Sequence, residues 1–126
     1  MKDRLLKIAL VAFGAIFILV YPLAMVWPSG WSWHMGAPYA SDYFMMIVGV
    51  YATLGVFLIL AARNPAAHRS LILFTAASSA VHAAIMAVQA IQMPEHSGHF
   101  FGDVPGLIVV AVVLYALLPP SKTATA

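Results

Sequence analysis

A first group of polar side chains that could do chemistry lies in one apolar stretch, residues 71–91. His82 is the only ionisable residue of that stretch, and Gln89 is its other strongly polar member. Polar and thioether side chains recur there every three or four positions, so they share one face of a helix. They are Thr75, Ser78, Ser79, His82, Met86 and Gln89, and Met93 continues the same face just beyond the stretch. Polar groups on an apolar helix turn inward, so an imidazole on this face could ligate, carry a proton or donate to a bound molecule.

Two roles are open for His82. In the functional interpretation, it binds a hydrophobic ligand, such as a quinone whose carbonyl accepts its N–H, in a pocket between the second and third apolar segments. The expected lining of that pocket is Tyr51, Ser78, His82 and Gln89. In the structural interpretation, a neutral His82 bonds to Tyr51, Thr53 or a backbone carbonyl and so joins two helices.

Small residues on the same two segments predict that these segments pack closely, because small side chains let backbones approach. They are Gly49, Ala52 and Gly55 on the second segment, and Ala76, Ala80, Ala83, Ala84 and Ala87 on the third.

A second group of candidate ligands lies in the loops before and after these segments. His34, His96, His99 and Glu95 offer imidazole and carboxylate donors, which suit Zn or Cu. Six of the seven methionines are expected on the same side of the molecule, and thioethers favour Cu(I). The spacing of His96 and His99 matches no specific metal motif, so histidines that hydrate or cap helix ends are the alternative.

The composition requires a membrane around these residues. Of 126 residues, 63% are hydrophobic and 8% are charged, whereas soluble domains carry about 25% charged residues. The absence of cysteine excludes disulfides, thiolate metal sites and thiol catalysis. Six Lys and Arg residues are too few for the clustered basic face that nucleic-acid binding needs.

Hydropathy predicts four spanning helices, since a bilayer core of about 30 Å takes about 20 apolar residues. Their expected ranges are 5–27, 43–62, 70–92 and 103–118, within a single transmembrane domain over residues 1–126. The predicted fold is an all-α, antiparallel four-helix transmembrane bundle. Asp103 is expected to cap the fourth helix, which is short for a span. The first helix is expected to stay uncleaved, since no Ala-x-Ala-like site follows it.

Charge predicts the orientation of this bundle. Every Lys and Arg lies at the amino end, in the loop 63–69 or in the carboxyl tail, and the other loops carry Asp42, Glu95 and Asp103. The positive-inside rule therefore places both termini in the cytoplasm of a bacterial inner membrane. The aromatic side chains that would sit at the outer interface are Trp27, Trp31, Trp33, Tyr39 and Tyr43.

Four runs of residues resemble a domain-of-unknown-function family of small bacterial membrane proteins with four predicted helices. These runs are Tyr51 to Pro65, His68 to Ile72, Ser78 to Gln89 and Gly102 to Pro105. The resemblance covers most of the chain after Tyr43 and implies a four-helix membrane fold without implying an activity. Where the family pattern implies an aromatic residue before the serine pair, this chain has Ala77.

No enzyme motif accompanies these features. The chain has no Gly-rich phosphate loop, no carboxylate within the spans, and no serine with a base and oxyanion donors. We therefore expect a non-enzymatic membrane protein that binds a small molecule or serves as an accessory subunit. The alternatives are a metal-binding protein, or a subunit of a membrane oxidoreductase whose partner supplies the missing groups.

Overall fold

The computed structural model describes residues 1–31 and 37–121, and these residues form helices and no strand. The α-helices are α1 (Lys2–Ile18), α2 (Val20–Val26), α3 (Pro28–Trp31), α4 (Asp42–Ala61), α5 (Arg69–Gln92) and α6 (Asp103–Ala116). The 3-10 helices are η1 (Pro38–Ala40), η2 (Pro65–His68) and η3 (Pro94–Phe101). The prediction of an all-α chain is confirmed.

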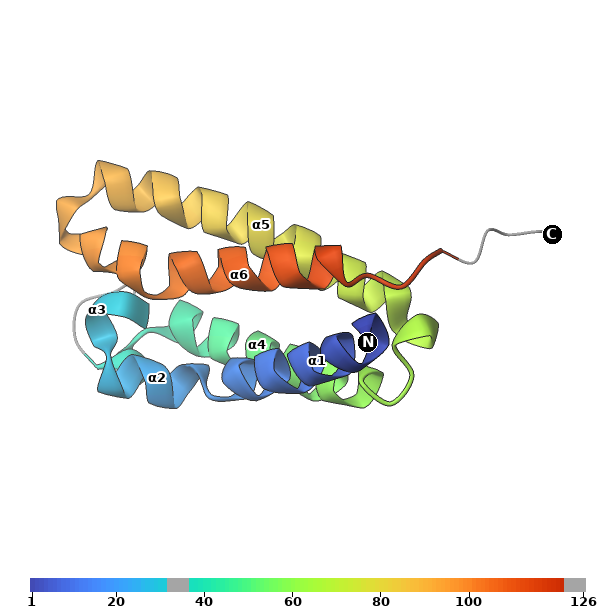
Figure 1. Ribbon diagram of the computed structural model, residues 1–126. Coiled ribbons are helices and arrows are strands. Elements are labelled where there is room, and N and C mark those ends of the chain that lie inside the picture. The colour runs from blue at the N-terminus through green and yellow to red at the C-terminus, as the bar shows by residue number, and fades with distance from the viewer. Residues whose placement is uncertain (32–36, 122–126) are drawn as a thin grey trace.

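The long helices pack as two pairs, α1 with α4 and α5 with α6. In Figure 1 the N-terminus and the last turn of α6 lie at one end of the molecule, and α3 lies at the other. Near the N-terminus the two pairs close on a shared core, in which several large side chains are no more than 2% exposed. That core includes Leu6 and Leu10 of α1, Leu58 of α4, Ile72 of α5 and Leu114 of α6.

The small residues serve different contacts from those expected. Gly55 of α4 packs against Gly14 of α1, where a Cβ on Gly14 would lie 2.6 Å from the Gly55 carbonyl oxygen. Gly49 has no described atom within 4 Å of the place a Cβ would take. The prediction that the second and third segments pack closely is therefore wrong, because α4 packs on α1 while α5 packs on α6.

The first predicted helix, over residues 5–27, is bent rather than continuous. Helix α1 ends at Ile18, and α2 continues at 60° to it. Proline removes one backbone N–H and its ring clashes with the carbonyl four residues earlier. For Pro22 that carbonyl belongs to Ile18, so the helix breaks where the proline requires it.

The last helix begins at Asp103, but Asp103 does not cap it. Gly102 holds the N-cap position and no side chain bonds to the free amides there. Helices η3 and α6 meet at 41°. Gly102 lies so close to the backbone of Gly30 that a Cβ would collide with the Gly30 carbonyl. This contact holds α3 against the start of α6.

The helices are suited to a membrane in length and in surface. Within residues 1–31 and 37–121, helix α4 and the segment Pro65–Gln92 are each long and apolar enough to cross one, and counting each bent pair as one span raises the number to four. The outer faces carry large apolar side chains on every long helix: Val11 is 46% exposed, Val50 63%, Val81 60% and Val112 61%. Such a surface suits hydrocarbon rather than water.

Candidate functional site

A cavity of about 620 Å³ opens between the two helix pairs, at the end that holds α3 and η3. Its walls are mostly aromatic and aliphatic, with a few polar groups. It is lined by Phe17, Val20, Trp31, Ser41, Tyr43, Phe44, Ile47, Tyr51, His82, Met86, Gln89, Met93, His96, Asp103 and Leu107. Every α-helix and η3 contributes a residue, so the cavity is a product of the whole fold.

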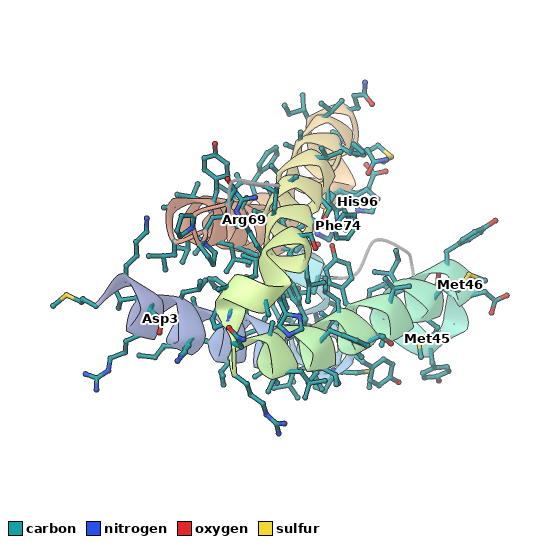
Figure 2. All side chains as sticks on the ribbon, turned by 90° about the vertical axis from the view of Figure 1, so that its right-hand side faces the viewer. Asp3, Met45, Met46, Arg69, Phe74 and His96 are labelled. Carbon is teal, nitrogen blue, oxygen red and sulfur yellow. The ribbon has the colours of Figure 1, made fainter. Side chains whose placement is uncertain are left out.

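The cavity exists because α4 and α5 diverge toward this end. Figure 2, viewed along the molecule from the opposite end, shows α4 running to one side while α5 runs upward. His96 lies in the angle between them in the same view. Nearer the N-terminus the shared core fills the space between the two pairs.

Tyr51 and His82 bridge the two helix pairs at the cavity. The Tyr51 hydroxyl lies 2.5 Å from His82 Nδ1, and the Tyr51 ring packs edge-on against Phe17, with centroids 5.0 Å apart. A phenol donates more readily than it accepts, so we assign the O–H as donor to Nδ1. His82 then carries its own proton on Nε2, which is the nitrogen left to donate to a ligand.

Of the other two expected pocket residues, Gln89 and Ser78, one lines the cavity and the other does not. Gln89 lines the cavity. Ser78 is not among the lining residues, and its hydroxyl donates to the Thr75 carbonyl oxygen at 3.3 Å. Thr75 likewise donates to the Leu71 carbonyl oxygen at 2.8 Å. Hydroxyl groups in helices commonly bond to the preceding turn in this way, so the polar stripe divides into backbone-bonded residues and cavity residues.

A buried pair, His99 and Asp103, stands beside the cavity. His99 Nδ1 lies 2.9 Å from Asp103 Oδ1, and the two side chains are 1% and 8% exposed. Asp103 and His96 both line the cavity, and the His96 ring centroid is 5.6 Å from that of His99. Asp103 therefore places a carboxylate at the cavity wall instead of capping its helix.

The structure brings two of the four expected metal ligands together. His96 and His99 are neighbours, Glu95 is exposed, and His34 lies outside the described residues. Across residues 1–31 and 37–121, no three His, Asp or Glu side chains are arranged to hold a metal ion. Met45 and Met46 point outward from α4, away from His96 (Figure 2). The metal site stays a prediction.

Trp31 is one of the cavity residues that sequence reasoning missed. Like Tyr43, it was expected at the outer interface, and like Tyr43 it lines the cavity. Its indole N–H is buried without a hydrogen-bond partner among the described residues. The available signal was the turn that precedes it. Pro28 and Gly30 permit a tight reversal that can carry the second tryptophan inward.

Comparison with known proteins gives a family and no activity. No curated protein matches the chain significantly. No solved structure does so either. One family model matches residues 2–125, which is nearly the whole chain. The chain therefore belongs to DUF6632, a family of unknown function.

Proposed function

We propose that this protein is a bacterial inner-membrane protein that binds a hydrophobic small molecule, such as a quinone, in the cavity between α4 and α5. It crosses the membrane four times as an antiparallel bundle, with both termini in the cytoplasm. Its role is non-enzymatic, as a binding protein or as an accessory subunit of a larger membrane assembly.

The cavity is the observation that carries this proposal. Small-molecule sites typically enclose about 300–1,000 Å³, with mostly apolar walls and a few placed polar groups. This cavity holds about 620 Å³ and combines aromatic walls with His82, Gln89 and Asp103. A lipophilic ring would fill the apolar volume, and His82 Nε2–H would donate to its carbonyl.

The cavity is also open to the side from which such a ligand would arrive. Tyr43 and Ile47 of α4 line it while remaining 81% and 43% exposed, and Gln89 of α5 is an exposed lining residue. These residues flank the gap between α4 and α5. In a bilayer this gap faces lipid, so a membrane-dissolved ligand can enter without crossing water.

Equilibrium binding to purified full-length protein tests the proposal. We expect His82→Ala to weaken binding of a short-tailed quinone by roughly 3- to 10-fold, the value of one lost hydrogen bond. His68→Ala is the matched control, because His68 is exposed on η2 away from the cavity. If His82→Ala leaves stability and binding unchanged across quinones and lipids, the pocket proposal fails.

The prediction of a Zn or Cu site has its own test. The closeness of His96 and His99 is the observation in its favour. Metal analysis of the purified protein and of a His96→Ala/His99→Ala variant should show bound Zn or Cu in the first and a lower amount in the second. Equal metal content in both proteins would remove this function.

An oxidoreductase subunit is distinguished by its partners. Co-purification of the same partner proteins from native membranes in repeated preparations would favour the subunit. Isolation of the chain alone would count against it.

A further inference from the structure

The cavity carries a carboxylate that no basic side chain balances. Asp103 is the only Asp or Glu among its described lining residues, and none of those residues is Lys or Arg. Residues 32–36 contain no Lys or Arg either. With the histidines counted as neutral, the described lining therefore holds one negative charge. Such a charge acts more strongly in a mostly apolar cavity than in water, because the surroundings screen it less.

His99 is the partner of this carboxylate, and it stands behind Asp103 as seen from the cavity. His99 Nδ1 lies 2.9 Å from Asp103 Oδ1, and a buried carboxylate needs such a partner. Asp103 lines the cavity, whereas His99 is not among the lining residues. A neutral His99 leaves the charge of Asp103 whole, and a protonated one leaves a dipole with its negative end at the cavity wall. In either state the cavity meets the carboxylate first.

The charge of Asp103 reaches across the cavity. It acts electrostatically on Tyr51 of α4 and on His82 of α5, so its field covers the walls that both helices supply. Those two side chains bond to each other and bring no cation of their own in the assigned tautomer. A positive group placed between the start of α6 and these side chains is thus within range of Asp103.

Aromatic rings supply the rest of a cation site. Phe17, Tyr43, Phe44 and Tyr51 line the cavity, and the face of an aromatic ring attracts a cation within about 6 Å of its centroid. Quaternary ammonium groups are recognised by such walls. An anion would be repelled both by the carboxylate and by the ring faces. The walls and the charge of this cavity therefore favour the same kind of ligand.

We propose that the cavity binds amphiphilic cations, whose ammonium group is attracted by Asp103 and the aromatic walls while an alkyl tail lies between α4 and α5. The exposed lining residues Tyr43 and Ile47 flank that gap, so the tail can extend toward lipid. This inference shares the cavity with the proposed function. It adds a charged ligand class that needs no hydrogen bond from His82.

The test uses the full chain in dodecylmaltoside micelles and two probes with the same tail and opposite charge, decyltrimethylammonium and decanesulfonate. Equilibrium dialysis measures binding, corrected for uptake by protein-free micelles. We expect the wild-type protein to bind the cation more tightly than the anion. Asp103→Asn should weaken cation binding by about 10-fold, the effect of two unit charges about 10 Å apart at an effective dielectric constant of about 20. It should not weaken anion binding. Glu95→Gln is the control, since it removes the same charge from an exposed residue that does not line the cavity.

Loss of cation binding without loss of anion binding in Asp103→Asn supports the inference. Equal weakening for both probes overturns it, because Asp103 would then act by shape, and so does an unchanged cation affinity. Equal affinities of the wild-type protein for the two probes also overturn it, even if Asp103→Asn fails to fold. Quinone binding is measured separately with His82→Ala, so a failure of this inference and a failure of the proposed function are distinguishable.

Discussion

At the scale of single residues, Tyr51 connects the parts of the molecule. Its side chain packs against each of the three buried clusters, and its hydroxyl contacts His82 on the opposite helix pair. The structural interpretation of His82 as a partner of Tyr51 is thus realised in the fold. It does not exclude the functional one, because Tyr51 occupies Nδ1 and leaves Nε2 for a ligand.

Tyr51→Phe separates these two roles. The substitution keeps the ring against Phe17 and removes only the hydroxyl. We expect a loss of about 1 kcal/mol in the free energy of unfolding, together with weaker quinone binding, because Nδ1 and Nε2 of His82 would then compete for the proton. Denaturant titration and equilibrium binding measure the two effects. Tyr115→Phe is the control, since Tyr115 is 68% exposed on α6. An unchanged affinity would show that Tyr51 does not orient His82.

At the scale of elements, the α1–α4 crossing and the bend at Pro22 shape the cavity. The backbones of α1 and α4 meet at Gly14 and Gly55, which anchors α4 to α1. The 60° bend then turns α2 away from the line of α1. Helix α3 follows and places Trp31 in the cavity. The glycine contact and the bend are local features of the backbone, and together they determine which residues line the cavity.

The glycine crossing gives a matched pair of variants. A Cβ on Gly55 would collide with the Gly14 carbonyl and lie 2.9 Å from Ile18 Cγ1. We expect Gly55→Ala to lower the free energy of unfolding by about 1–3 kcal/mol, the usual cost of overpacking. Gly49→Ala, on the same helix with open space around it, should leave stability unchanged or slightly higher, since alanine favours helix. Equal effects of the two variants in denaturant titrations would contradict this account of the crossing.

At the scale of the whole molecule, the two ends differ both in the charged side chains they carry and in how the helices pack there. The end that holds the N-terminus carries Arg69, whose Nε donates to the Pro119 carbonyl oxygen at 2.7 Å, and the exposed pair Asp3–Lys7 at 3.2 Å. Figure 2 views the molecule from this end. The other end carries the cavity and the His99–Asp103 pair. In the proposed orientation the cavity thus opens in the outer half of the membrane.

Single-cysteine labelling tests that orientation, and the natural chain contributes no background because it has no cysteine. Ser97 and Ala66 are both exposed, and the helices that carry them, η3 and η2, lie at opposite ends of the molecule (Figure 1). In spheroplasts, a membrane-impermeant maleimide should label Ser97→Cys and should label Ala66→Cys only after lysis. The reverse pattern would invert the topology, and labelling of both before lysis would contradict four spans with these loops on opposite sides.

Much of this molecule follows from its sequence for a physical reason. Long apolar segments with few charges must satisfy their backbone polar groups internally, so hydropathy was enough to predict an all-α chain with membrane-spanning length. The three-and-four spacing around His82 identified the helix that carries the polar residues, because side-chain direction within a helix is a local property. The break at Pro22 also has a local cause, the proline itself. Hydropathy predicted one continuous helix over residues 5–27 because the hydrophobic run continues through the break.

Tertiary structure decided which helices are neighbours and hence where the cavity lies. Small residues on the second and third segments permit close packing, but they do not determine which helix is the packing partner. In the structure Gly55 of α4 packs against Gly14 of α1. Gln89 faces the cavity while Ser78 bonds its own backbone, a difference that spacing along one helix cannot reveal. Trp31, Asp103 and His82 come from three helices. Their meeting depends on packing between distant segments, which no local pattern encodes.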